Sequence, residues 1–336
     1  MTAIDAGAAL PQQKKDYLPI LLPFALALIA APLIGSFPTW LTLTFAGLAM
    51  GMMIFAMASG LTLVFGLMDV LNFGHGAFIS VGAYLAMVAL TPLAALQGAD
   101  SLGLNLMALA PAMVFAMIAS AAAGYVFERA LVRPVYGQHL KQILITMGGL
   151  IVVEQMLYAI FGPQINPLPL PNALRGSIEF AGAALEKYRL FAVVVGLIVF
   201  AALQFTLTRT KIGLLIRAGV ENKEMVEALG YRIRRLFVAV FMAGSALAGL
   251  GGMLWALYRE QVHASMGGEM MVLTFIVIII GGLGSVSGCF IGSILLALLA
   301  NYAGFLAPKV ALVSNIALMV AVLLWRPRGL YPVTSR

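Results

Sequence analysis

The residue types that most often carry out chemistry in proteins are scarce in this sequence. There are only three histidines (His75, His139 and His263) and one cysteine (Cys289), and they lie far apart along the chain. A single cysteine excludes a disulfide framework and a multi-cysteine metal site. Neither a His-Glu-x-x-His motif nor a Gly-x-x-x-x-Gly-Lys-[Ser/Thr] phosphate loop occurs. We therefore expect no metal, no cofactor and no covalent catalysis in this chain.

Polar residues that interrupt long apolar stretches are better candidates for function. In MDVLNFGHGAF, three polar side chains and two glycines break the apolar pattern: Asp69, Asn72, His75, Gly74 and Gly76. Within a membrane, such groups persist only where protein or a water-filled cavity satisfies them. The segment is therefore interpreted either as part of a translocation pathway or as a simple cytoplasmic turn between two helices.

Two further interruptions have similar alternatives. The stretch GGLGSVSG, from Gly281 to Gly288, allows either close helix packing through small residues or a broken helix beside a pathway. Glu154 lies within an apparent span, where a carboxylate is a functional candidate by default; pairing with Gln155 or a polar subunit interface would also explain it. The residues predicted to belong to the pathway are Asn72, Phe73, His75, Gly76, Glu154, Gly281, Gly282, Gly284 and Ser285.

The segment ENKEMVEALGYRIRRL, residues 221–236, has seven charged residues in sixteen positions. Asn222 suits an N-cap, Glu224 suits the positive end of the helix dipole, and Gly230 is placed to end the helix in the left-handed conformation. The predicted helix spans residues 223–229, with Met225, Val226 and Leu229 on one side. A helix this short needs a surface to lie on. That surface is either the lipid headgroup region or a partner protein.

The surrounding elements follow from composition. The chain is 62% hydrophobic and 10% charged, with a mean hydropathy of +1.03. Seven charges at the centre of a bilayer would cost about 20 kcal/mol, so residues 221–236 do not span. Ten apolar runs approach spanning length: 18–35, 41–66, 75–96, 106–127, 142–162, 189–208, 235–257, 270–281, 288–307 and 309–325. The sequence predicts an all-α polytopic membrane protein with 8–10 transmembrane helices, some broken or re-entrant.

The distribution of positive charge predicts the orientation. With the N-terminus inside, 15 of the 20 Lys and Arg residues fall in cytoplasmic segments, as the positive-inside rule requires. The net charge of +7 is explained in this way without a nucleic-acid partner. The predicted divisions are a cytoplasmic tail over 1–17, a transmembrane domain over 18–325 with a cytoplasmic loop at 209–234, and a cytoplasmic tail over 326–336. The apolar stretches at 76–86 and 288–299 also resemble each other, either as repeats or by chance.

Four stretches together resemble the permease subunits of branched-chain amino acid ABC importers, of the LivH type: GLTLVFGLMDVLNFGHGAFISVGAYLA, RTKIGLLIRAGVENKEMVEALGYRIRRL, GGLGSVSG and LLWRPRGLYP. The similarity covers about residues 41–332. Its most specific parts are Asn72–Gly76, Arg209–Gly230 and Arg326–Leu330. Gly74 stands where the family usually has alanine, a small-for-small departure that says nothing about the substrate.

The resemblance implies a set of partners. Such permeases pair with a second permease of the LivM type, bind two cytoplasmic ATPase subunits of the LivG and LivF types, and receive substrate from an external binding protein. ATP and Mg are bound by those ATPases. The resemblance also places the chain in the inner membrane of a bacterium, among membrane lipids, with both termini cytoplasmic. The implied ATPase-coupling residues are Asn222, Lys223, Glu224, Met225, Glu227, Ala228, Leu229 and Gly230.

The function that the resemblance implies is ATP-driven import of leucine, isoleucine, valine or related amino acids, with this chain forming half of the pathway. Related permeases carry urea or short amides, and that alternative stays open. An ion-coupled secondary transporter would need a relay of carboxylates, for which Glu154 and Asp69 are thin material. An integral-membrane enzyme would need a compact catalytic cluster, which the sequence lacks.

Overall fold

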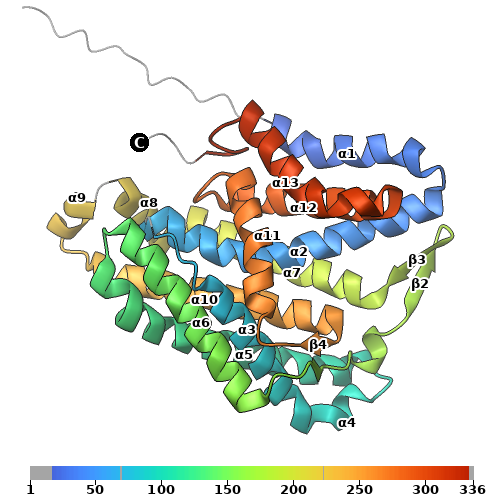
Figure 1. Ribbon diagram of the computed structural model, residues 1–336, viewed down its shortest axis with the longest axis horizontal. Helices are drawn as coiled ribbons and strands as arrows, with labels where there is room; N and C mark the ends of the chain where they lie inside the picture. The colour runs from blue at the N-terminus through green and yellow to red at the C-terminus, as the bar shows by residue number, and fades with distance from the viewer. Residues whose placement is uncertain (1–16, 69, 222, 333–336) are drawn as a thin grey trace, which may run out of the picture.

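The computed structural model describes residues 17–68, 70–221 and 223–332 and shows a bundle of helices with two small two-stranded sheets (Figure 1). The α-helices are α1 Leu18–Ile34, α2 Phe37–Met68, α3 His75–Leu90, α4 Ala94–Gln97, α5 Leu102–Phe127, α6 His139–Phe161, α7 Lys187–Arg209, α8 Lys211–Glu221, α9 Lys223–Ala228, α10 Ile233–Arg259, α11 Met266–Gly281, α12 Val286–Leu306 and α13 Pro308–Trp325. The strands are β1 Asn166–Pro167, β2 Ser177–Phe180, β3 Ala183–Glu186 and β4 Gln261–Val262. Short π and 3₁₀ turns occupy Thr91–Leu93, Glu128–Val132, Arg133–Val135 and Asn172–Leu174.

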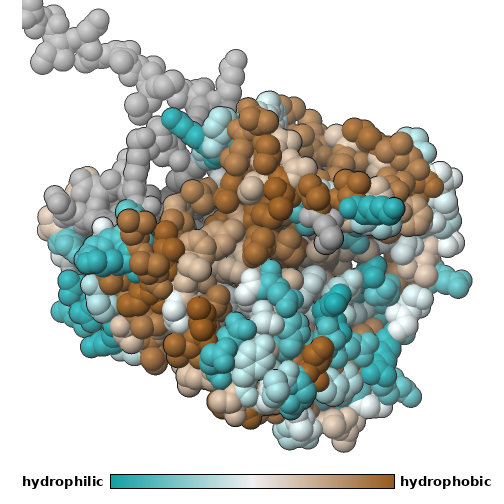
Figure 2. Space-filling model, viewed as in Figure 1, coloured by the Kyte–Doolittle hydropathy of each residue, from teal (hydrophilic) through white to brown (hydrophobic). Residues whose placement is uncertain are grey.

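Nine of the ten predicted apolar runs each correspond to one of these helices, and the run 75–96 spans α3, the turn Thr91–Leu93 and most of α4. Among the described residues, seven helical segments are long and apolar enough to cross a membrane, and three shorter apolar helices lie at Leu18–Ile34, Met266–Gly281 and Val313–Trp325. The outer surface of α6 is apolar at Leu140, Leu144, Met147, Ile151, Val152, Met156 and Ile160. Figure 2 shows an apolar band across the molecule between two polar ends. The predicted all-α, multi-pass membrane class is confirmed.

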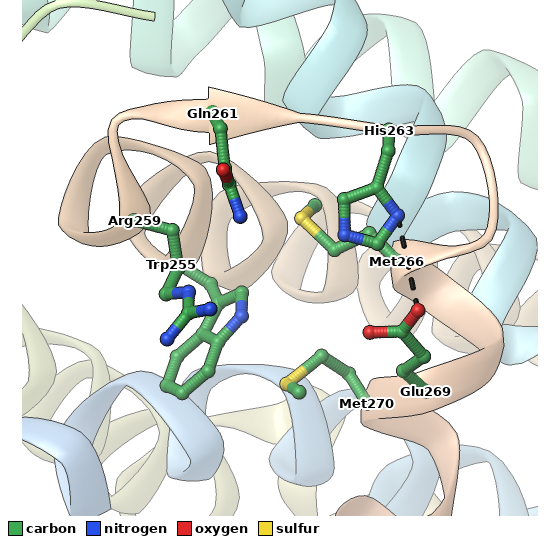
Figure 3. A pocket seen from close by; sticks show the side chains of 7 residues that line it. All are labelled: Trp255, Arg259, Gln261, His263, Met266, Glu269 and Met270. Carbon is green, nitrogen blue, oxygen red and sulfur yellow. Dashed lines mark ion pairs between the residues drawn. The ribbon is translucent and has the colours of Figure 1, made fainter. Parts of the chain in front are cut away.

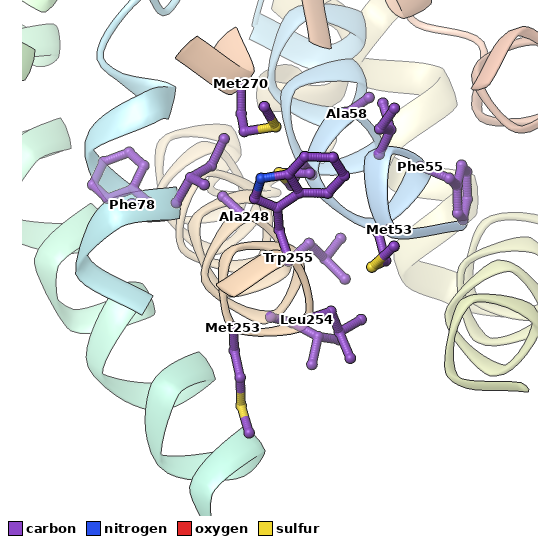
Figure 4. Close-up of a cluster of buried hydrophobic side chains, with 14 of the residues drawn as sticks. Met53, Phe55, Ala58, Phe78, Ala248, Met253, Leu254, Trp255 and Met270 are labelled. Atoms are coloured by element: carbon purple, nitrogen blue, oxygen red, sulfur yellow. The ribbon is translucent and has the colours of Figure 1, made fainter. Parts of the chain in front are cut away.

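The centre of the bundle is formed by α2 and α10, which run antiparallel. The apolar segment of α2 is 78% buried and that of α10 is 67% buried, whereas that of α6 is only 17% buried and lies at the periphery. A Cβ added to Gly60 would lie 2.2 Å from the carbonyl oxygen of Gly244, so the two backbones are in direct contact. Met53 and Phe55 on α2 and Trp255 on α10 are among the buried side chains of the hydrophobic core (Figure 4).

The α2–α3 and α10–α11 units have matching designs. In each, a long helix is followed by a six-residue connection, at 69–74 and 260–265, and then by a helix of 16 residues. Each short helix packs against the long helix of the other unit: α3 packs against α10, and α11 packs against α2 and also against α3. The first turns of α3 and α11 meet: a Cβ on Gly267 would lie 1.9 Å from the carbonyl oxygen of Gly76. We call this meeting point the junction, comprising residues 72–76 and 264–267.

The similarity between residues 76–86 and 288–299 is not reproduced as a structural repeat. Helix α12 has 21 residues and runs along α2, with Gly51 against Ile294 and Gly47 against Leu298. Helix α3 begins instead beside Met57, eleven residues before the end of α2, which is about 16 Å along the helix. The α2–α3 unit therefore corresponds to α10–α11, in which a long helix is likewise followed by a six-residue connection and a helix of 16 residues.

The loops gather at two ends of the bundle. At one end β1 pairs antiparallel with β4, with Asn166 opposite Val262, and β2 and β3 form a hairpin. At the other end lie α8 and α9 (Figure 1). The stretch 163–188, with its four prolines, is thus largely extended, apart from the short turn at Asn172–Leu174.

Candidate functional site: the junction and the charged segment

The segment Asn72–Gly76 is buried inside the bundle. The backbone N–H of Phe73 donates to Thr146 Oγ1 at 3.2 Å, and the Phe73 ring lies on Phe275 with 4.6 Å between centroids. His75 Nε2 lies 2.9 Å from the carbonyl oxygen of Met57. These contacts tie the segment to α6, α11 and α2, which is not the packing of an exposed cytoplasmic turn.

Several polar atoms at the junction have no protein partner. Asn72 and His75 are both 0% exposed. Among the described residues, nothing hydrogen-bonds to either polar atom of the Asn72 side chain or to Nδ1 of His75. A buried polar group left unpaired costs about 1–3 kcal/mol, and such groups are few in native proteins. The junction is therefore a polar and energetically costly site within an apolar core, which makes it a functional candidate.

Ser80 fastens the two short helices together. Its Oγ donates to the carbonyl oxygen of Ala264 at 2.8 Å and accepts from the N–H of Gly267 at 2.9 Å. Sequence reasoning missed Ser80, Thr146 and Gly267. A signal was present for Gly267, because the pair Gly267–Gly268 follows α10 much as Gly74 and Gly76 follow α2.

The glycine-rich segment Gly281–Ser285 lies at the far end of α11, about 21 Å along the helix from Gly267. Gly282 and Gly284 have φ of +99° and +82°, and Ser285 Oγ caps α12 by accepting from the N–H of Gly288 at 3.1 Å. The chain after α13 covers this turn, since Tyr331 N–H donates to the Gly281 carbonyl at 3.0 Å. The structure thus does not bring this segment to the junction.

Glu154 is also remote from the junction. It lies half-buried on α6, and Gln155 beside it is exposed. Among the described residues, Glu154 has no ion pair or hydrogen-bond partner. The described residues contain no group of three His, Cys, Asp or Glu side chains that could hold a metal ion.

The charged segment, residues 221–236, begins at the last residue of α8, includes the short helix α9 and continues into the start of α10. Helix α9, Lys223–Ala228, ends one residue before the prediction, and Gly230 has φ of +86°. Gly230 N–H donates to the Glu227 carbonyl at 2.9 Å and Tyr231 N–H to the Val226 carbonyl at 3.3 Å. These two bonds are the Schellman pattern that a left-handed glycine permits. The predicted N-cap, Asn222, lies outside the described residues.

The apolar residues of α9 do not share one face as predicted. Val226 is 4% exposed and packs on the bundle, whereas Met225 and Leu229 are 57% and 70% exposed. The reason is geometric: residues 225 and 229 are four apart and align on a helix, whereas residue 226 is rotated by about 100°. Val226 therefore holds α9 against the bundle. Met225 and Leu229 form an exposed apolar edge that, with Glu227, faces away from the bundle.

A hollow of about 540 Å³ lies between α9 and the start of α10. Its lining is dominated by charge: Glu227, Gly230, Tyr231, Arg232, Ile233, Arg234 and Arg235. At the same end of the bundle, Tyr136 donates to the buried carboxylate of Glu128 at 2.6 Å. Burial, followed by this hydrogen bond, raises the pKa of Tyr136, so its phenol stays protonated as a donor.

The comparisons with known proteins agree with this architecture. The family model described as branched-chain amino acid transport system / permease component matches residues 43–323. The chain is 29% identical to the high-affinity branched-chain amino acid transport system permease protein BraD of Pseudomonas aeruginosa, over 84% of this chain and 93% of that protein. Identity to LivH of Escherichia coli K12 is 25%, over 85% of this chain and 93% of LivH. Identity to LivM of the same strain is 26%, over 82% of this chain and 67% of LivM.

No solved structure matches the chain. The family model begins within α2, covers the rest of that helix, all of α10, the junction and the charged segment, and stops within α13. The chain therefore belongs to the family of permease components of branched-chain amino acid transport systems.

Proposed function

We propose that this chain is one of two permease subunits in an ATP-driven importer of leucine, isoleucine, valine or related amino acids. The second permease is of the LivM type, two ATPase subunits of the LivG and LivF types bind ATP and Mg on the cytoplasmic side, and an external binding protein delivers the substrate. The observation that supports this most is the family match over residues 43–323, which includes the segment suited to ATPase docking. The proposed location is the bacterial inner membrane, with both termini in the cytoplasm.

The coupling residues are proposed on α9 and its cap. Met225, Glu227 and Leu229 are exposed, while Val226 anchors the helix to the bundle. A short helix that presents one edge to an external groove is a recurrent mode of recognition. Closure of the ATPases would push on this edge, and α8 would transmit the movement to α2 and α7, against which it packs.

The junction is the proposed moving part of the pathway. Two helix beginnings meet there, a few hydrogen bonds around Ser80 hold them together, and the unpaired polar groups of Asn72 and His75 make the packing energetically costly. Broken helices of this kind line the binding sites of many transporters. Gly281, Gly282, Gly284 and Ser285, which were predicted for the pathway, are better explained as the packed turn beneath the C-terminal segment, and Glu154 as a peripheral carboxylate.

An ATP-driven importer of urea or short amides remains the second candidate, because it would use the same coupling. Of the two carboxylates considered for an ion-coupled relay, Asp69 lies outside the described residues, and Glu154 is the one acidic residue of the apolar helix α6.

The experiment is uptake of labelled leucine into vesicles that contain this chain with its co-encoded permease, ATPases and binding protein. The test variant replaces Glu224, Glu227 and Gly230 by alanine. The matched control replaces Glu179, Glu186 and Gly182, which also comprise two glutamates and a left-handed glycine but lie in the β2–β3 hairpin at the opposite end.

ATP-dependent uptake that is lost in the test variant and retained in the control supports both the substrate class and the coupling segment. Normal uptake in the test variant contradicts the coupling assignment. Substrate-stimulated ATPase activity without leucine uptake favours the urea or amide alternative. A complex that never assembles with ATPases contradicts the importer itself.

A further inference from the structure

A cavity of about 230 Å³ lies at the end of α10 that is farthest from α9, beside β4 and the first turns of α11. Figure 3 shows its lining: Trp255, Arg259, Gln261, His263, Met266, Glu269 and Met270. Ligand pockets for drug-sized molecules typically have 300–1,000 Å³. This smaller cavity fits a ligand with the size of a single amino acid. The cavity adjoins the junction, with which it shares Met266.

Two opposite charges face the cavity from different helices. Arg259, at the end of α10, is exposed and makes no ion pair with an acidic group of the described residues. Glu269, in the first turns of α11, lies across the cavity from it (Figure 3). Glu269 Oε1 accepts from Ser265 Oγ at 3.4 Å and lies 3.8 Å from His263 Nδ1. The guanidinium and the carboxylate thus do not neutralise each other.

Of the other five lining residues, Gln261 and His263 are polar, and the three apolar ones are firmly placed. Trp255, Met266 and Met270 are 9%, 1% and 8% exposed. Methionine side chains adapt to differently shaped aliphatic groups because they are flexible and polarizable. A fixed ring and two adaptable thioethers suit a branched aliphatic chain better than a polar one.

A ligand that satisfies this lining must carry one negative group, one positive group and a small apolar part. A simple anion would be repelled by Glu269, and a simple cation by Arg259. A neutral molecule such as urea or a short amide would leave both charges uncompensated. We propose that the cavity binds a free aliphatic amino acid, with its carboxylate at Arg259, its ammonium at Glu269 and its side chain on Trp255, Met266 and Met270.

The location gives this site a place along the pathway. The cavity lies beneath the paired strands β1 and β4, at the end of the bundle where the proposed binding protein would deliver substrate. Met266 in its wall is followed directly by Gly267, which contacts Gly76 at the junction. The site thus lies between the external loops and the junction. This inference deepens the proposed function and rests on it for the source of the ligand.

The test measures equilibrium binding of labelled leucine to the four-subunit membrane complex in lipid nanodiscs, without the external binding protein. The variants are Arg259→Gln and Glu269→Gln. Both wild-type side chains are exposed, so neither change removes core packing. The matched controls are Lys309→Gln and Glu179→Gln, which remove one exposed charge of each sign outside the cavity. Competitors are leucinamide, which lacks the carboxylate, and 4-methylpentanoate, which lacks the ammonium.

Each cavity variant is expected to weaken leucine binding about tenfold, equivalent to about 1.4 kcal/mol, while the controls stay within about twofold. Arg259→Gln should also abolish the preference for leucine over leucinamide, and Glu269→Gln the preference for leucine over 4-methylpentanoate. A general loss of structure would not produce this crossed pattern.

Wild-type binding no greater than that of empty nanodiscs would overturn the proposal. So would variants that keep wild-type affinity and preferences. If the complete system still imports leucine with ATP in either case, the proposed function stands and only the cavity assignment falls. Conversely, binding with the crossed pattern but no ATP-driven uptake would support the cavity and contradict the importer.

Discussion

Replacing Gly267 by alanine tests the close contact at the junction. The added Cβ would lie 1.9 Å from the Gly76 carbonyl oxygen and 2.7 Å from its carbon, and ordinary contact begins near 3.4 Å. The first turns of α3 and α11 would have to separate by about 1.5 Å, because the atoms in the way are backbone. Overpacking a dense core costs about 1–3 kcal/mol. At about 2 °C per kcal/mol for a chain of this size, we expect the apparent melting temperature to fall by roughly 2–6 °C.

The neighbouring glycine provides the control. A Cβ on Gly268 would meet nothing within 4 Å, and the residue lies in the same helix. Gly268→Ala should therefore be neutral or stabilising by up to about 1 kcal/mol, the helix propensity difference. The assay is the melting of the detergent-solubilised protein, scanned at one heating rate because unfolding of such proteins is commonly irreversible. If both variants melt alike, the junction is not closely packed and the reasoning about it is refuted.

Three further predictions concern single contacts. Thr146→Val removes the acceptor for the Phe73 N–H and should lower the free energy of unfolding by about 1–3 kcal/mol. The control Thr208→Val loses only an exposed hydrogen bond within its own helix and should change that free energy by no more than about 0.5 kcal/mol. Equal shifts in melting temperature would contradict this prediction. Tyr136→Phe should destabilise the protein by about 1.5–3 kcal/mol by removing the donor to buried Glu128. Burial raises the pKa of Tyr136 in the folded state. The stabilisation by Tyr136 is therefore complete below about pH 10, the pKa of tyrosine in the unfolded chain, and is lost as pH rises above that value. Denaturant titrations from pH 8 to 11 should show that the difference in unfolding free energy between wild type and variant becomes smaller. Gly230→Ala places a side chain at a backbone φ of +86°, which costs about 1 kcal/mol. Amide hydrogen exchange at the end of α9 should therefore become about fivefold faster. Unchanged exchange rates would contradict the Schellman cap.

Much of the architecture could be predicted because it depends on local composition. All ten apolar runs are helical, nine as single helices and the run 75–96 as α3 followed by a short turn and α4, since their length and hydropathy suffice to define membrane segments. The end of α9 was predicted from Gly230 for a similarly local reason: only glycine adopts the left-handed cap at no steric cost. Such features need no knowledge of what packs against the helix.

The junction could not be predicted in the same way. Helices α3 and α11 are apolar around most of their surface, so periodicity does not show which face meets which neighbour. Ser80 and Thr146 look like ordinary hydroxyl residues until α3 is placed against α11 and α6. The error over the apolar face of α9 has the same origin, because only the bundle decides that Val226, and not Met225, is covered. The roles assigned to the coupling and pathway residues remain predictions.

The exchange of short helices between the α2–α3 and α10–α11 units has a consequence for biosynthesis. Helix α3 finds its packing surface on α10, whose synthesis is completed about 170 residues later. At 5–20 residues per second, this delay is roughly 8–34 s. During that time Asn72 and His75 have no completed core around them and must be sheltered by water, by lipid headgroups or by the insertion machinery. The first half of this permease is therefore synthesised well before it can fold, and its quality control must tolerate a partly inserted chain.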